Sequence, residues 1–188
     1  MGGTFDPIHV AHLIIAEEAL ESAGLERVIF VPAARPPHKT VGEITAVGHR
    51  LEMVRLAIAD NPRLEISDVE AGRPEPSYTI DTVRHFRREL GEEEALHFIM
   101  GADSLAQFFT WKSPVELLSS CEFIVVPRPG VRIEDGDARI REKARVLDTP
   151  LMGVSSSDIR ERARTGRSIR YLVPPAVRAY IEKKSLYS

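Results

Sequence analysis

The stretch Gly2-Gly3-Thr4-Phe5-Asp6-Pro7-Ile8-His9-Val10-Ala11-His12 decides the fold of this chain. Two adjacent glycines allow the backbone to approach a bulky ligand and to adopt positive φ angles that a side chain would resist. Asp6 is a suitable helix cap and Pro7 a suitable first helical residue, and apolar residues then recur at helical spacing from Leu13 to Leu20. The pattern therefore predicts a Gly-rich turn that leads into the N-terminus of a helix.

Such a turn is a favourable site for phosphate, because free backbone N–H groups and the positive end of the helix dipole meet there. His9 and His12 are three residues apart, so both side chains can lie on one face of the first helical turn and point toward the same ligand. Each part alone has an ordinary explanation, since a Gly-Gly pair is often a plain turn and two such histidines can lie at the surface. The order of all the parts together favours a phosphate site.

The composition is that of one globular domain. The 188 residues, 43% of them hydrophobic and 28% charged, suffice for a substantial core, so we expect a single domain over residues 1–188. A net charge of −3 gives no overall attraction to nucleic acid or to an anionic membrane, so local basic groups must hold any anionic ligand. The single cysteine, Cys121, excludes an internal disulfide, and no apolar run is long enough to span a bilayer. These features predict a cytoplasmic protein without nucleic-acid or membrane partners, and they leave a homo-oligomer open.

Predicted strands alternate with predicted helices along the chain. The apolar or alternating runs that indicate strands are 27–31, 64–69, 95–100, 122–126 and 145–147. This alternation is typical of an α/β protein with a Rossmann-like, doubly wound parallel sheet that helices cover on both faces. Ligands bind such sheets at the carboxyl ends of the strands.

Several stretches beside the predicted strands carry polar groups that suit a ligand. Ser77 or Thr79 could cap the helix that ends near Leu90, and Ser155 with Asp158 fits a capping pattern that opens a later helix. Both helix starts would present free N–H groups to an anion. Each stretch also has a plain structural explanation, as a solvated loop, a turn, an ordinary cap or a core residue. The candidates are Pro36-Pro37-His38-Lys39, Ser77-Tyr78-Thr79, Gly101-Ala102-Asp103, Trp111, Arg128 and Ser155-Ser156-Ser157-Asp158-Ile159-Arg160.

The opening loop followed by His-x-x-His resembles the nucleotidylyltransferase superfamily, whose signature has His-x-Gly-His; Ala11 stands here where Gly is usual. Taken from end to end, the chain looks like the bacterial nicotinate mononucleotide adenylyltransferases. The stretches that carry this resemblance are the opening loop, the candidates named above, Arg128-Pro129-Gly130 and the tail Tyr171-Leu172-Val173-Pro174. Ser157 stands where the family often has Thr, which keeps the hydroxyl.

The resemblance implies an adenylyltransferase that joins ATP and nicotinate mononucleotide into nicotinate adenine dinucleotide and releases pyrophosphate. The mononucleotide phosphate is already ionised and attacks the ATP α-phosphorus directly, so neither a nucleophilic side chain nor a general base is required. Catalysis then consists of positioning and charge stabilisation. The resemblance implies Mg²⁺ held mainly by the ATP phosphates and water, with no metal ligand from the protein. Two alternatives remain, a phosphopantetheine adenylyltransferase and a nucleotide-binding domain without catalytic activity.

The resemblance also assigns roles to individual residues. The residues that it implies for contact with the ATP phosphates in catalysis are His9, His12 and Arg160. The residues implied for the rest of the ATP site are Gly2, Gly3, Thr4, Phe5, Gly101, Asp103, Ser155 and Ser156. Those implied for the acceptor are Thr79 and Trp111, which would hold and stack the nicotinate ring, with Lys39 and Arg128 as phosphate contacts.

Only Met1 precedes Gly2, whereas the family has an apolar strand immediately upstream of this loop. In a doubly wound sheet that strand lies in the middle, so its neighbours would lose ladder partners, at roughly 1–3 kcal/mol for each buried unpaired group. The sequence therefore predicts a truncated first central strand. It leads us to expect either a start at an internal Met or upstream residues outside the given sequence.

Overall fold

A computed structural model describes residues 1–34, 44–73, 76–91 and 93–188. Its strands form two parallel three-stranded sheets, with the orders β1-β2-β3 and β4-β5-β6. The strands are β1 (Gly2–Gly3), β2 (Val28–Pro32), β3 (Leu64–Ile66), β4 (His97–Gly101), β5 (Glu122–Val126) and β6 (Ala144–Val146). All five strands predicted from the sequence are present, with ends that differ by at most three residues.

The two sheets meet at β1 and β4. A Cβ atom on Gly2 would lie 3.7 Å from the ring of Phe98 in β4, so the two strands are neighbours, although no ladder joins them in the described part of the chain. Read across both sheets, the strand order is 3-2-1-4-5-6, which is the doubly wound order that the sequence predicts. The ladder is interrupted here because β1 has only two residues and pairs with β2 through Gly2↔Val31 and Gly3↔Pro32. In this structure β1 is thus a two-residue strand, and its truncation stays a prediction.

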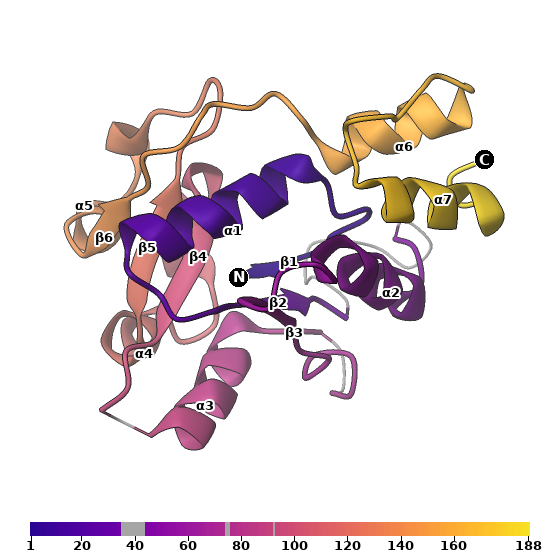
Figure 1. Cartoon of the computed structure of the whole chain (residues 1–188). Coiled ribbons are helices and arrows are strands. Elements are labelled where there is room, and N and C mark those ends of the chain that lie inside the picture. Colours follow the sequence, from indigo (N-terminus) through magenta and orange to yellow (C-terminus); the bar gives the residue numbers. More distant parts are fainter. Residues whose placement is uncertain (35–43, 74–75, 92) are drawn as a thin grey trace.

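The helices pack on both sides of these strands, as Figure 1 shows: α1 crosses one side and α3 lies on the other. In the same view α2, α6 and α7 gather at one end of the molecule, beside the C-terminus. The α-helices are α1 (Val10–Ser22), α2 (Val47–Ile58), α3 (Thr79–Leu90), α4 (Pro114–Ser120), α5 (Ala138–Arg141), α6 (Ser156–Arg164) and α7 (Pro175–Lys183). Short 3₁₀ turns are η1 (Ala102–Ser104), η2 (Phe108–Thr110) and η3 (Ile133–Asp135). Within the described ranges, no helix has the length and apolar character needed to cross a membrane.

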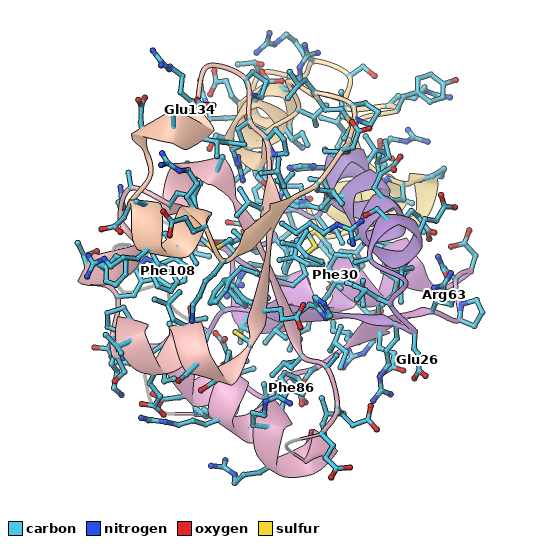
Figure 2. All side chains as sticks on the ribbon, turned by 90° about the vertical axis from the view of Figure 1, so that its left-hand side faces the viewer. Glu26, Phe30, Arg63, Phe86, Phe108 and Glu134 are labelled. Atoms are coloured by element: carbon cyan, nitrogen blue, oxygen red, sulfur yellow. The ribbon has the colours of Figure 1, made fainter. Side chains whose placement is uncertain are left out.

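The hydrophobic core has two parts, and β5 contributes to both. Ile124 and Val126 join the cluster around Phe30, whereas Phe123 and Val125 join the cluster around Phe108. Successive side chains of a strand point to opposite faces, so a strand that helices cover on both sides must be apolar throughout. Figure 2 labels Phe30 and Phe108, whose rings lie inside the molecule, while Glu26, Arg63 and Glu134 lie at its edges.

Candidate active site

The Gly-Gly loop owes its glycines to close packing. Neither Gly2 nor Gly3 adopts a positive φ angle, contrary to the expectation from sequence; Phe5 does, with φ of 50°. A Cβ atom on Gly3 would lie 2.7 Å from the Phe5 ring, which no side chain could accept without a shift of the loop. The Phe5 ring is buried and meets the rings of His12 and Phe30 edge to face, at centroid distances of 5.0 and 5.5 Å. Glycine therefore lets Phe5 fold beneath the loop and support His12.

Helix α1 begins at Val10, with His9 in the cap position, so the prediction that Asp6 caps the helix and Pro7 opens it is wrong. The buried Asp6 carboxylate binds elsewhere: Oδ1 accepts a hydrogen bond from the Tyr187 hydroxyl at 2.6 Å, and Oδ2 accepts one from the backbone N–H of Thr45 at 3.1 Å. The carboxylate raises the pKa of Tyr187, although burial contributes more to that shift. Asp6 thus fixes the loop to the C-terminal tail and to the start of the α2 region.

The two histidines form a stacked pair at the start of α1. Their ring centroids are 3.7 Å apart and the rings are inclined by 21°. The backbone N–H of His9 donates to Nδ1 of His12 at 3.2 Å, so in the neutral imidazole Nε2 carries the proton and is the donor atom. Burial, together with the Arg128 charge, lowers the pKa of His9 to about 4 and places the pKa of His12 well below its usual value. Both rings are therefore neutral near pH 7.

Helix α6 approaches the same loop from the chain's distant C-terminal part. Ser155 caps α6 by accepting a hydrogen bond from the N–H of Asp158 at 3.1 Å, as the sequence predicts. The Ser156 hydroxyl donates to the carbonyl oxygen of Pro7 at 2.9 Å, and Nη1 of Arg160 donates to the carbonyl oxygen of Asp6 at 2.8 Å. These two bonds place the N-terminus of α6 against the loop that carries the histidines.

A cavity of about 970 Å³ lies where β1 meets β4, the point at which the strand order reverses and doubly wound sheets bind their ligands. It contains eight of the fifteen predicted site residues: Gly2, Gly3, Thr4, Thr79, Gly101, Asp103, Trp111 and Arg128. The predicted site residues that are described but do not line this cavity are Phe5, His9, His12, Ser155, Ser156 and Arg160. Lys39 lies outside the described residues. The cavity also extends between the two sheets, along apolar side chains such as Phe86 and Leu96.

At the mouth of this cavity, Asp103 and Arg128 form an ion pair directly above Gly101. Nε of Arg128 lies 2.9 Å from Oδ1 of Asp103, and both side chains are more than half exposed. A Cβ atom on Gly101 would come within 2.7 Å of the Arg128 guanidinium and closer still to the Asp103 carboxylate. Glycine is therefore required for this pair to close over the end of β4. The Arg128 charge also contributes to the lowered pKa values of both histidines, after burial.

The opposite wall of the cavity is built by the start of α3 and by Trp111. Tyr78 occupies the cap position of α3 without a side-chain cap bond, so the prediction of a Ser77 or Thr79 cap is wrong. The Ser77 hydroxyl instead accepts a hydrogen bond from the backbone N–H of Ala34 at 3.2 Å. The Trp111 ring packs near Phe98 and Phe108, with centroid distances of 6.1 and 5.4 Å. One part of Trp111 thus belongs to the core and another lines the cavity.

Three residues near the site were not found from the sequence: Arg50, Lys112 and Tyr187. Lys112 pairs with Asp81 at 2.9 Å and lies over the Tyr78 ring, with Nζ 4.5 Å from its centroid. Arg50 could have been found from the sequence, because it falls on the same face of the predicted helix as the apolar residues 54, 57 and 58. A charged side chain on that face needs a buried partner. Tyr187 left no local signal, since its partner Asp6 is 181 residues away.

Comparison with known proteins agrees with this geometry. The sequence profile of the cytidylyltransferase-like family matches residues 1–162. Proteins named probable nicotinate-nucleotide adenylyltransferase are 45% identical in Pelobacter propionicus and 48% identical in Exiguobacterium sibiricum; the alignments cover all of this chain and 96% and 97% of those proteins.

Among solved structures, Plasmodium falciparum nicotinic acid mononucleotide adenylyltransferase complexed with NaAD matches with a TM-score of 0.82 at 23% identity. That match covers 99% of this chain and 94% of the other, and at this identity it supports the fold alone. Because the profile spans most of the chain and the full-length relatives exceed 40% identity, the chain belongs to the cytidylyltransferase-like family and, within it, to the nicotinate-nucleotide adenylyltransferases.

Proposed function

We propose that this chain transfers the adenylyl group of ATP to nicotinate mononucleotide in a single displacement, as a cytoplasmic enzyme of NAD biosynthesis. An oxygen of the mononucleotide phosphate forms a bond to the ATP α-phosphorus, and the bond between that phosphorus and the β-phosphate oxygen breaks. The products are nicotinate adenine dinucleotide and pyrophosphate. The full-length relatives that carry the nicotinate-nucleotide adenylyltransferase name support this assignment.

The observation that carries the proposed mechanism is the stacked histidine pair at the start of α1, in which His9 is buried and His12 half-buried and both pKa values are lowered. With Nδ1 of His12 occupied by the His9 N–H, the Nε2–H group is a fixed donor that needs no reorganisation during the reaction. Donors held in place before charge develops stabilise a transition state far more than donors that must first turn toward it. We propose that His12 and His9 donate to ATP phosphate oxygens, and that Arg160 with Ser155 and Ser156 closes over the phosphates from α6.

The acceptor would bind on the other wall. The N-terminus of the 12-residue helix α3 presents free backbone N–H groups at Thr79, which suit the carboxylate of the nicotinate ring. Trp111 offers an aromatic face for that ring, and Arg128 a positive charge for the phosphate. Asp103 would hold the adenosine ribose by hydrogen bonds. This arrangement favours a pyridine mononucleotide over phosphopantetheine, which offers neither a carboxylate-bearing ring nor a surface to stack on Trp111.

We propose that Mg²⁺ would be held by phosphate oxygens and water, which are the hard oxygen ligands that this ion prefers. When bound, it neutralises part of the phosphate charge.

The test is His12→Ala, measured by pyrophosphate release with ATP and a panel of acceptors. We expect turnover to fall about 10²–10³-fold, as is typical for one preorganised donor, while the melting temperature shows that the variant is folded. His85→Ala is the matched control, because His85 lies on α3, is not among the described residues that line the cavity, and pairs with Glu89. Near-parental turnover in a folded His12→Ala protein would refute the role of His12. Faster turnover of the parent with phosphopantetheine than with nicotinate mononucleotide would refute the acceptor.

A further inference from the structure

Arg50 is a buried arginine on the apolar face of α2, with only 1% of its surface exposed. Within the described part of the chain, its guanidinium donates three hydrogen bonds, each to a backbone carbonyl oxygen of a different segment. Nη1 donates to Thr4 at 2.8 Å, Nη2 to Ala34 at 2.9 Å and Nε to Thr45 at 2.8 Å. A buried charge is costly unless its donors are satisfied, and these three bonds give each guanidinium nitrogen an acceptor. An arginine on an otherwise apolar helix face therefore indicates a function beyond packing.

Two of these carbonyls belong to segments that reach the cavity: Thr4 lines it, and Ala34 directly follows the lining residue Ala33. Thr4 follows β1 in the Gly-Gly loop, whose tip leads to the histidine pair. Ala34 follows β2, and its N–H donates to the Ser77 hydroxyl, which lies two residues before the start of α3. An unbroken chain of contacts thus runs from the Gly-Gly loop through Arg50 and Ala34 to the segment that opens the acceptor wall.

We propose that Arg50 is a positioning residue that sets the separation and orientation of two parts of the site. These are the ATP wall, meaning the Gly-Gly loop with the histidine pair, and the acceptor wall, meaning the start of α3 with Trp111. This inference rests on the function proposed above. In a direct displacement, the attacking phosphate oxygen must lie about 3–3.5 Å from the α-phosphorus and in line with the leaving group. Neither wall alone determines that geometry. Arginine suits the task because its planar fork holds several donors at fixed angles, whereas a lysine ammonium is a single flexible point.

This role predicts that a change at Arg50 lowers kcat but leaves the binding of each substrate almost unchanged. Each substrate contacts mainly one wall, so loosening the link between walls should leave the separate dissociation constants almost unchanged. The rate of the chemical step should fall, since a misplacement of about 1 Å can cost about 100-fold in rate. A purely structural Arg50 would lower the melting temperature and leave kcat of the folded protein unaltered.

The experiment is Arg50→Lys, with kcat measured at saturation and with the dissociation constants of a non-hydrolysable ATP analogue and of nicotinate mononucleotide measured separately by calorimetry. We expect kcat to fall 10- to 100-fold and each dissociation constant to change less than about threefold. Arg55→Lys is the matched control, because Arg55 lies on the same helix but at the surface, paired with Glu52. A kcat of Arg50→Lys within twofold of the parent value would overturn the proposal.

Ser77→Ala is the second variant, in case Arg50→Lys does not fold. It removes the hydroxyl that fixes Ala34 to the acceptor wall and leaves the buried charge in place. We expect a three- to tenfold fall in kcat without weaker binding of either ligand; weaker acceptor binding at unchanged kcat would count against the proposal. The turnover of the parent with nicotinate mononucleotide checks the proposed function by itself. The role of Arg50 is judged by the ratio of variant to parent, with whichever acceptor the parent uses.

Discussion

Acid should weaken this fold through His9, and the size of the effect follows from the structure. Burial, with a further contribution from the Arg128 charge, lowers the pKa of His9 from 6.5 to about 4. The folded protein therefore binds fewer protons than the unfolded chain between these two values, and its stability rises with pH across that window. The stabilisation is complete above pH 6.5 and is lost as the pH falls toward 4. At about 1.4 kcal/mol for each unit of pKa shift, the full loss from His9 alone is about 3 kcal/mol, of which about 2.5 kcal/mol is lost by pH 4.5.

The assay is urea denaturation of the parent and of His9→Asn at several values between pH 7.5 and 4.5. Asparagine does not titrate, so the difference in unfolding free energy between the two proteins should shrink by about 2.5 kcal/mol over this range. Titrating groups other than the two histidines are present in both proteins and cancel. Because burial also lowers the pKa of His12, the double variant His9→Asn/His12→Asn should give a larger change. A difference that stays constant within about 0.5 kcal/mol would show that the fold does not hold His9 neutral.

Three further predictions test the walls of the cavity. Trp111→Ala should weaken binding of nicotinate mononucleotide about tenfold, as loss of a stacking face does, and change ATP binding little; calorimetry that finds equal losses for both would contradict its role. Gly3→Ala should destabilise the protein by about 1–3 kcal/mol because the new methyl group meets the Phe5 ring, whereas Gly48→Ala, in open space on α2, should stabilise it slightly in the same melting experiments. Gly101→Ala should displace the Asp103 carboxylate and weaken binding of an ATP analogue; unchanged calorimetric affinity would exclude this carboxylate from the ribose site.

The fold could be predicted because its signals are local. A strand that is buried on both faces is apolar at its buried positions, so the apolar residues 123–126, with Glu122 before them, predicted β5 with its observed ends. Helix starts were harder, because capping preferences point to Asp6 and Ser77 while the chain uses His9 and Tyr78. At both starts the favoured polar side chain bonds a distant segment instead of the helix. Tertiary contacts thus override local preference where the loop must be held in place.

The candidate site could be predicted only in part, and the reason lies in how it is held. The sequence indicates residues that would touch a ligand, but three of the atoms that fix the Gly-Gly loop are the backbone carbonyl oxygens of Thr4, Asp6 and Pro7. Every residue has a backbone carbonyl, so the sequence does not show which of them accept hydrogen bonds from distant side chains. Their donors, Arg50, Ser156 and Arg160, lie between 46 and 154 residues from them in the chain.

This arrangement suits the proposed chemistry. A direct displacement between two phosphates needs neither a nucleophilic side chain nor a general base, so the protein can lower the barrier mainly by placing the phosphates and by presenting fixed donors to the developing charge. The loops that carry the donors must then keep fixed positions, and buried hydrogen bonds from helices hold them there. It follows that substitutions beneath the loop should reduce turnover as strongly as substitutions in the cavity lining, which is the pattern that Arg50→Lys tests.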